Sequence, residues 1–482
     1  MNGFPSYRGD LRYVCTHCAG SFPGSDLLYT CPACSGVLLL EDASFDALRE
    51  RSGPDWQEVF DARAAGRNPA LSGIFRFYEL IAPVLEEEDI LCLGEGNTPV
   101  VPASPALQER TGAAFAFKNE GQNPSASFKD RGMACAFSFL KTLLRKRGWS
   151  SVLTVCASTG DTSASAAMYA AYLGESVKSV VLLPQGKVTP QQLSQPLGSG
   201  ARVLEIPGVF DDCMKVVEFL SERYPVALLN SKNSWRILGQ ESYAFELAQW
   251  RRWDMRDVCV FVPIGNAGNI TAVLKGFLKL YALGVITVLP RIFGVQSQHA
   301  DPVYRYYAAP ATSRSYAPVA VRPSAAQAAM IGNPVSFPRV RLLAERYEAA
   351  AGPDSFHVLQ VTEQAIMDSM LEANSHGHIA CPQGGECLAG LKAALQYGLV
   401  SSRHFSILNA TAHALKFADF QNLYFTDAFP PDFGIRPRPE LTNAPEAVLS
   451  PAERREMGES RFLSETAARI ARRLDLTPRQ AD

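Results

Sequence analysis

The chain has 482 residues, of which 47% are apolar and 20% are charged, a composition typical of globular proteins. Because single hydrophobic cores stop growing at roughly 250–300 residues, this length predicts two or three domains with room for a buried active site. The 46 basic and 48 acidic side chains leave a net charge of −2. Such a chain has no strong field for nucleic acid phosphates or anionic lipids, so we do not expect it to bind either.

The sequence also predicts a soluble, cytoplasmic protein. No window of about 18 apolar residues could form a membrane-spanning helix, and residues 1–10 lack the basic-then-apolar pattern of a signal peptide. The 11 cysteines are an odd number and too few for a disulfide scaffold of this length. This favours free thiols in a reducing compartment.

Four cysteines form two CxxC pairs near the amino terminus. Cys15 and Cys18 are separated from Cys31 and Cys34 by a segment at 19–30, and each pair is followed two residues later by a glycine. This spacing is typical of a zinc ribbon, in which two turns present four thiolates to a tetrahedral metal ion. Four cysteines leave no open coordination position, so we expect a structural zinc ion in a module covering residues 1–40. A ribbon that has lost its metal, or a redox pair, is the alternative.

A repeated pattern begins near residue 91, after a mixed, helix-prone segment at 41–90. Short β-branched runs end in loops of Gly, Ser or Asn, and each loop opens a longer amphipathic stretch. Alternating units of this kind predict an α/β fold, with a mainly parallel sheet covered by helices on both faces. Ligands in such a fold bind at the carboxyl ends of the strands. The loops at those ends, within a catalytic region of residues 41–440, are therefore the candidate site elements.

The first such loop, at 123–132, reads NPSASFKDRG and lies between a strand expected to end near Lys118 and a helix expected to begin near Phe128. A lysine at a helix start feels the positive end of the helix dipole. This lowers its pKa and favours the neutral amine that Schiff-base chemistry needs. Lys129 is that candidate. A solvated lysine in the first helical turn is the alternative for such a residue taken alone.

Two later loops suit anions. The loop at 157–165 is rich in small hydroxyl residues and opens an alanine-rich helix, which predicts a carboxylate site. An ordinary helix cap is the alternative there. In the loop at 263–269, Gly265 and Gly268 allow backbone amides to approach a phosphate closely. Together with Lys129, these loops describe a pyridoxal phosphate site that holds an amino acid.

The remaining segments indicate organisation and not chemistry. Residues 301–340 are rich in Pro, Ala, Tyr and Arg, so we expect an irregular connection between two lobes. Residues 441–482 are expected to form a helical extension, because Ser450 to Glu453 matches a capping box with proline in the first helical turn.

The motifs occur in the same order as in the threonine synthase family, which the chain resembles over about residues 1–416. The matching segments are LGEGNTP at 93–99, NPSASFKDRGM at 123–133, ASTGDTSASAA at 157–167, PIGNAGNITA at 263–272, IGNPVSFP at 331–338 and a TAH segment near Thr411. This resemblance implies fold type II of the pyridoxal phosphate enzymes, a two-lobed parallel-sheet fold similar to that of tryptophan synthase β. Some members of the family also carry a leading ribbon.

The resemblance also implies roles for individual residues. Lys129 forms the Schiff base with the cofactor, Thr411 faces its pyridine nitrogen, and Asp161 lies beside its phenolic oxygen. The cofactor phosphate is held by the backbone of Gly265, Asn266, Ala267, Gly268 and Asn269. The substrate carboxylate meets Ser158, Thr159 and Thr162, and the substrate's own phosphate meets Asn230, Ser231 and Arg236.

Two positions depart from the common pattern of the family. Asp161 stands where asparagine is more common, and an ionised carboxylate beside a phenolate is repulsive. We therefore expect Asp161 either to be protonated or to stabilise a protonated nitrogen in the bond between cofactor and lysine. Ser125-Ala126 replaces a common Thr-Gly pair, a small-for-small change that we expect to be mild.

The resemblance implies a lyase that converts O-phospho-L-homoserine and water to L-threonine and phosphate by γ-elimination and β-addition, with a homodimer as a possible assembly. Two rival functions keep the fold. One is a cysteate-synthase-like β-replacement on O-phosphoserine, and the other is a threonine-dehydratase-like ammonia-lyase, whose substrate carries no phosphate. A zinc-ribbon interaction protein on an inactive scaffold is a rival from another class. The presence of Lys129 and the near-neutral charge argue against it.

Overall fold

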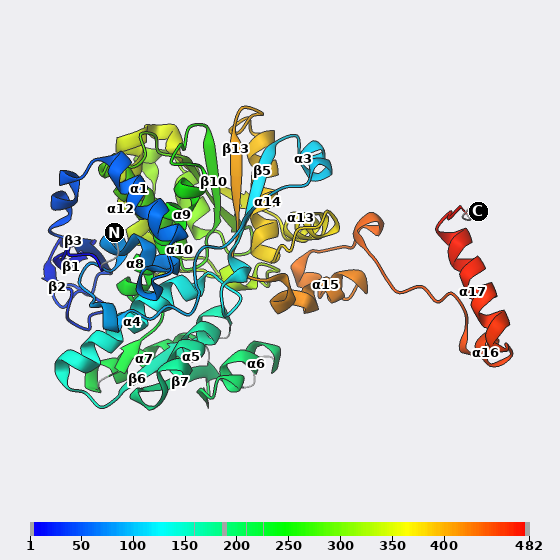
Figure 1. Cartoon of the computed structure of the whole chain (residues 1–482), viewed down its shortest axis with the longest axis horizontal. Coiled ribbons are helices and arrows are strands. Elements are labelled where there is room, and N and C mark those ends of the chain that lie inside the picture. The colour runs from blue at the N-terminus through cyan, green and yellow to red at the C-terminus, as the bar shows by residue number, and fades with distance from the viewer. Residues whose placement is uncertain (1–3, 159, 186–189, 209, 225, 478–482) are drawn as a thin grey trace.

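The computed structural model describes residues 4–158, 160–185, 190–208, 210–224 and 226–477. These residues form a small antiparallel sheet near the amino terminus, two α/β lobes and a helical extension at the carboxyl end (Figure 1). Within these ranges, no helix is both long enough and apolar enough to cross a membrane.

The larger lobe contains a six-stranded sheet in the order β12-β11-β10-β13-β5-β4. Neighbouring strands are parallel except for the edge pair of β4 and β5. The strands are β4 (Val100–Pro102), β5 (Ala114–Asn119), β10 (Val258–Pro263), β11 (Arg291–Ser297), β12 (Phe356–Val361) and β13 (Phe405–Ala410). Every residue of β10 is buried, as expected at the centre of a parallel sheet with helices on both faces.

Helices lie on both sides of this sheet (Figure 1). One side carries α9 (Ser242–Trp250), α10 (Gly268–Ala282) and α12 (Phe337–Ala351), and the other carries α13 (Glu363–Ser375) and α14 (Pro382–Gln396). The shorter helices α3 (Pro105–Thr111) and α11 (Pro302–Ala308) complete the lobe. Residues 301–340 connect β11 to α12 within this lobe, so the expectation that they link the two lobes is wrong. Their composition indicates an irregular connection but not which sheet the flanking strands join.

The smaller lobe contains a parallel sheet in the order β8-β7-β6-β9. Its elements are β6 (Val152–Ala157), α5 (Asp161–Leu173), β7 (Val177–Pro184), α6 (Pro190–Gly198), β8 (Arg202–Ile206), α7 (Phe210–Arg223) and β9 (Val226–Leu228). Helices α4 (Lys129–Arg147) and α8 (Ser234–Gln240) pack against each other between the two lobes (Figure 1). The alternating pattern of strands and helices is confirmed, but its units divide between two sheets.

The amino-terminal sheet has the order β2-β1-β3, with both pairs antiparallel. Its strands are β1 (Leu11–Cys15), β2 (Ser21–Pro23) and β3 (Leu38–Asp42), and the helices α1 (Gly53–Ala65) and α2 (Tyr78–Ile81) follow. The ring of Phe60 on α1 packs against Phe77, which in turn packs against Phe245 of α9, with centroid distances of 5.1 and 5.2 Å. This aromatic chain joins the amino-terminal helices to the larger lobe.

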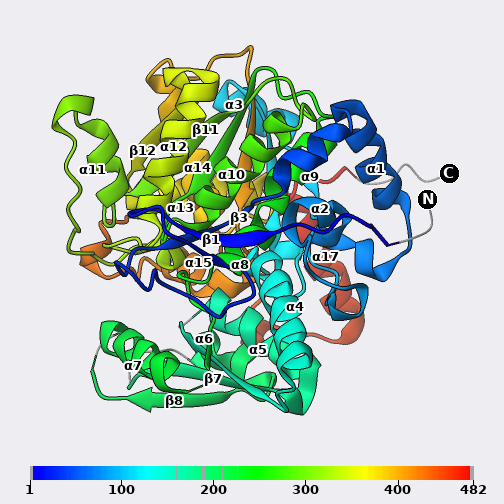
Figure 2. The ribbon, with the colours of Figure 1, turned by 90° about the vertical axis from the view of Figure 1, so that its left-hand side faces the viewer.

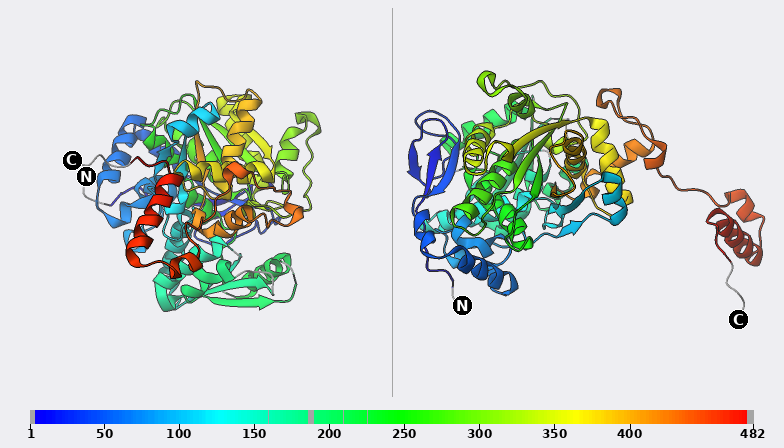
Figure 3. Two further views of the ribbon diagram at one scale, coloured as in Figure 1. Left: turned by 90° about the vertical axis from the view of Figure 1, so that its right-hand side faces the viewer. Right: turned by 90° about the horizontal axis from the view of Figure 1, so that it is seen from above.

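Helix α15 (Ala418–Phe425) follows β13 and packs against the larger lobe, and the carboxyl-terminal extension contains α16 (Pro451–Arg455) and α17 (Glu459–Arg473). The capping box is confirmed, because the Ser450 hydroxyl accepts a hydrogen bond from the Glu453 amide and the Ser450 amide donates to the Glu453 carboxylate at 2.7 Å. Helices α16 and α17 stand away from the lobes at the end of an extended segment (Figure 3).

Candidate active site

A cavity lies between the lobes. Part of its lining comes from segments that directly follow the carboxyl ends of β6, β9, β10 and β13, in both sheets. The predicted site residues that line it are Lys129, Asp161, Ser231, Arg236, Gly265, Asn266, Ala267, Gly268, Asn269 and Thr411. Ser158, Thr162 and Asn230 are described but do not line this cavity, and Thr159 lies outside the described residues.

Lys129 is the first residue of α4, at the position where the helix dipole was expected to act. Burial, and then the positive charge of Arg236, lowers the pKa of Lys129 to about 7. The direction agrees with the sequence-based expectation, but the largest cause is loss of contact with water and not the helix terminus. A lysine with this pKa is partly neutral near pH 7, as a nucleophile or a general base must be.

The glycine loop between β10 and α10 is shaped by close packing. A Cβ atom on Gly265 would come within 2.9 Å of the Ala329 Cα atom, so only glycine fits there. The left-handed conformation falls on Ala267, with φ of 63°, and not on the glycines. The side-chain nitrogen of Asn269 is buried and has no protein partner. Since the first amides of a helix also lack partners within it, this loop offers donors for an anion.

Arg236 lies on α8 and is only 4% exposed. One of its terminal nitrogens donates to the Leu229 carbonyl oxygen at 2.8 Å, while its Nε atom has no protein partner. Burial lowers its pKa to about 10, which still leaves the guanidinium charged at neutral pH. The cavity therefore contains a second anion-binding group, separate from the glycine loop.

Asp161 forms an ion pair that the sequence analysis missed. It is the first residue of α5 in the smaller lobe, and its Oδ1 atom lies 2.8 Å from the Nζ atom of Lys416. Lys416 follows β13 in the larger lobe and also donates to the Ser125 carbonyl oxygen at 3.0 Å. This ion pair joins the two lobes beside the cavity.

The cavity wall also includes Gln383, in the first turn of α14. Both polar atoms of its side-chain amide are buried without a protein partner. Thr411 directly follows β13 and is 4% exposed. Buried polar groups without partners are rare in folded proteins and indicate that a ligand supplies the missing contacts.

The four cysteines of the amino-terminal module come together. The sulfur atoms of Cys15, Cys18, Cys31 and Cys34 all lie within 4.8 Å of one another. The turns carry their left-handed residues at Ala19 and Ser35, each one position before the glycine. Gly36 is required for another reason, because a Cβ atom there would come within 2.9 Å of the Cys15 sulfur.

This module packs against the helix that carries Arg236, with β1 and β3 beside α8 (Figure 2). The Ser234 hydroxyl donates to the Leu38 carbonyl oxygen at 2.7 Å, and the Trp235 indole donates to the Tyr13 hydroxyl at 3.1 Å. The position of α8 therefore depends on the strands that carry the cysteine turns.

Comparisons with known proteins agree with this geometry. A family model described as pyridoxal-phosphate dependent enzyme matches residues 91–404. Threonine synthase 2, chloroplastic, of Arabidopsis thaliana is 34% identical over 390 residues, which are 80% of this chain and 72% of the relative. Threonine synthase of Methanocaldococcus jannaschii is 33% identical over 407 residues, covering 84% of this chain and 93% of the relative.

Solved structures show the same fold. Threonine synthase from Escherichia coli matches with a TM-score of 0.63 at 20% identity, covering 85% of this chain and 90% of that chain. The pyridoxal phosphate-bound threonine synthase from Brucella melitensis matches with a TM-score of 0.60 at 22% identity and the same two coverages. The chain belongs to the pyridoxal-phosphate dependent enzymes and, among them, to the threonine synthase family. The type II fold expected from the sequence is thereby confirmed.

The residues of the cavity fit the cofactor of this family. The glycine loop at the start of α10 presents amides and the unpartnered Asn269 nitrogen to a phosphate. Lys129 presents an amine that is partly neutral near pH 7. The unpartnered Gln383 amide adds polar contacts on the same wall.

Proposed function

We propose that this protein is a threonine synthase, a carbon–oxygen lyase that converts O-phospho-L-homoserine and water to L-threonine and phosphate. The observation that carries the proposal is that Lys129, Arg236 and a separate glycine loop all line one cavity. One phosphate-binding element serves the cofactor, so the second suits a substrate that carries a phosphate of its own. The purified chain, loaded with pyridoxal phosphate, should form threonine from O-phospho-L-homoserine. No threonine would exclude the proposal.

In this proposal, the residues of the cavity divide between cofactor and substrate. Lys129 carries the cofactor, the loop at 265–269 holds its phosphate, and Thr411 and Asp161 lie beside its ring. When bound, pyridoxal phosphate withdraws electrons from the substrate carbons near the amino group. The neutral hydroxyl of Thr411 cannot protonate a pyridine nitrogen, which suits elimination and replacement more than transamination.

The chain's own groups then bind the substrate and move protons. Arg236 and Ser231, with Asn230 beside them, hold the substrate phosphate. Ser158, Thr159 and Thr162 receive the carboxylate. The Nζ atom of Lys129, with a pKa of about 7, takes up and returns protons at the substrate's α and β carbons near neutral pH.

The rival substrates differ in how well they use these groups. An ammonia-lyase substrate without phosphate leaves Arg236 without its partner. O-phosphoserine retains the phosphate and differs by one methylene, which is worth about 1–3 kcal/mol in a binding pocket. The phosphohomoserine assignment therefore rests on the family, and the assay of both substrates decides it. A homodimer and a cytoplasmic location remain predictions.

We also propose that the four-cysteine cluster binds one structural zinc ion per chain. Replacing Cys31 by serine should release the zinc and lower the unfolding temperature of the amino-terminal module. Because this module contacts α8, the KM for the phosphorylated substrate should rise several-fold, while cofactor absorbance stays largely unchanged. Zinc analysis, thermal unfolding and steady-state kinetics measure the three effects.

Cys92 provides the matched control for this prediction, because it is a half-buried free cysteine outside the cluster. The Cys92→Ser variant should keep its zinc. Metal analysis that finds no zinc in unchelated, freshly purified protein would disprove the zinc site.

The ion pair between Asp161 and Lys416 joins the two lobes beside the cofactor, so we expect its members to act together. The Lys416→Met variant should lose about tenfold in kcat/KM, because a buried carboxylate is left without its cation. A double-mutant cycle with Asp161→Asn should give a coupling energy of about 1–2 kcal/mol. If the two single effects simply multiply in the double variant, the pair has no functional coupling.

A further inference from the structure

A second cavity lies apart from the active site and shares none of its lining residues. Its empty volume is about 610 Å³. The residues that line it come from α1, from the segments on both sides of α2 and from β4, β5 and α9, and those used below are Asp61, Arg76, Asn97, Lys118, Gln249 and Trp250. Part of this volume is open to solvent, and charged and apolar side chains both line it.

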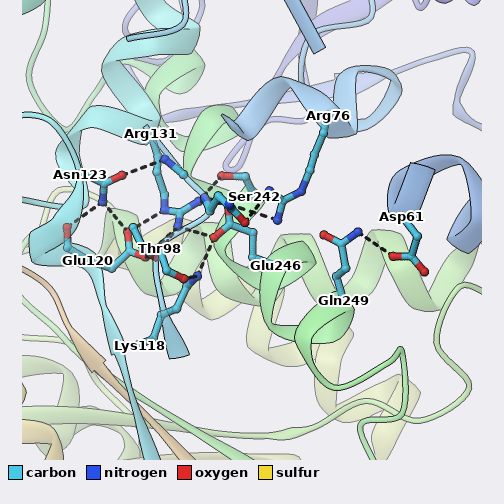
Figure 4. A network of polar contacts seen from close by, with 12 residues as sticks. Asp61, Arg76, Thr98, Lys118, Glu120, Asn123, Arg131, Ser242, Glu246 and Gln249 are labelled. Carbon is cyan, nitrogen blue, oxygen red and sulfur yellow. Dashed lines mark hydrogen bonds and ion pairs between the residues drawn. The ribbon is translucent and has the colours of Figure 1, made fainter. Parts of the chain in front are cut away.

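The inner wall of this cavity borders a buried network of charges (Figure 4). Arg131 donates to both oxygens of Glu120 and to both oxygens of Glu246, at 2.6 to 2.9 Å. Lys118 donates to Glu246 at 2.6 Å. Burial alone would raise the pKa of Glu246, but the charges of Arg131 and Lys118 hold it well below its usual range. Both carboxylates are therefore already paired within the network.

Arg76 adds a third cation to this wall and is the least well paired of the three. It is 4% exposed and donates one hydrogen bond, to the Asn97 side chain at 3.1 Å. Its nearest nitrogen lies 3.7 Å from Glu246, and its Nε atom has no protein partner. The wall thus holds three cations, namely Arg76, Lys118 and Arg131, against the two carboxylates of Glu120 and Glu246. The exposed Asp61 is a third carboxylate that acts on Arg76, so the charges balance. The buried Nε atom of Arg76 still lacks a protein partner, and it is the donor that the cavity offers to an anionic group.

The opening of the cavity has the opposite charge. Asp61 is exposed there, and its carboxylate accepts a hydrogen bond from Gln249 at 2.7 Å (Figure 4). It also accepts one from the Trp253 indole at 3.2 Å. Trp250, which is 39% exposed, supplies an apolar wall. A free phosphate would be attracted by Arg76 but repelled by Asp61. A zwitterion meets an opposite charge at each end.

We propose that this second cavity binds a small free amino acid, with its carboxylate on Arg76 and its ammonium group toward Asp61. This site does not depend on the proposed function of the first cavity. It is nevertheless connected to it, because Arg131 lies in the first turn of α4, two residues after Lys129. An amino acid in this cavity therefore contacts the same charge network that anchors the start of the catalytic helix.

Calorimetric titration of the loaded enzyme with L-proline tests the proposal. L-proline is a zwitterion. Its secondary amine cannot form a neutral imine with the cofactor, so it does not bind covalently in the active site. We expect saturable binding to one site per chain with a Kd of about 1–10 mM. The Arg76→Leu variant should weaken this binding by about tenfold or more, because it loses the charge-assisted contact.

Two further measurements keep the test decisive even if the Arg76 variant folds poorly. Asp61 is exposed, so Asp61→Asn removes a negative charge with little effect on folding. This variant should weaken binding of L-proline. It should strengthen binding of propionate, which lacks the ammonium group. The Arg236→Leu variant, altered only in the first cavity, should bind L-proline like the unchanged enzyme. No saturable binding, or binding lost in Arg236→Leu and kept in Asp61→Asn, would overturn the proposal.

Discussion

The Lys129→Ala variant is expected to lose threonine formation by about a thousandfold or more, since general acid–base catalysis alone contributes about 10²- to 10⁴-fold. It should also lose the absorbance of the bond between lysine and cofactor, because no other amine among the described cavity-lining residues replaces it. Weak, non-covalent binding of the cofactor through its phosphate should remain, because the glycine loop is a separate element. Steady-state kinetics and the absorption spectrum measure both losses.

The unchanged enzyme provides the complementary test of the same lysine. Borohydride reduction followed by peptide mapping should place the pyridoxyl group on Lys129. Lys118 is a useful comparison, because it is also buried but does not line the first cavity. Its amine donates to Glu246 in the charge network beside the second cavity. A pyridoxyl group found on Lys118 would contradict the assignment.

The Arg236→Leu variant should lose a charge-assisted contact worth about 1.5–3 kcal/mol, which corresponds to a decrease in kcat/KM of about 10- to 150-fold for the phosphorylated substrate. Cofactor loading should change little, because the cofactor phosphate is held by the separate loop at 265–269. Kinetics and cofactor absorbance on the same preparation distinguish these two effects.

Arg236→Lys is the matched control for this prediction. Lysine retains the positive charge and a donor for the Leu229 carbonyl oxygen but lacks the planar fork, so it should rescue the activity only in part. Wild-type activity in Arg236→Leu would mean that this arginine has a structural role alone. Loss of the cofactor along with activity would mean that its role is not specific to the substrate.

Sequence patterns predicted the parts of the site that follow strands and begin helices. Lys129 and the glycine loop could be found because each stands at a strand-to-helix junction, where parallel sheets bind ligands. The cysteine cluster could be found because its spacing is local. By contrast, the pairing of Lys416 with Asp161 joins residues from different lobes, and no spacing in the sequence indicates it.

Backbone conformation was harder to assign to individual residues. Ala19, Ser35 and Ala267 adopt the left-handed conformation, and no pattern in the sequence indicates this. Glycine is required nearby because a Cβ atom at Gly36 or Gly265 would collide with a sulfur atom or with backbone. Such close approaches depend on tertiary packing, which periodicity does not report. The same is true of the contact between the ribbon and α8.

The central claim is tested most directly by measuring kcat/KM for O-phospho-L-homoserine and for O-phosphoserine on the loaded enzyme, with the amino acid product identified by chromatography. The threonine synthase assignment predicts that O-phospho-L-homoserine is preferred and that L-threonine and phosphate form in equal amounts. Preference for O-phosphoserine, or phosphate release without threonine, would contradict it.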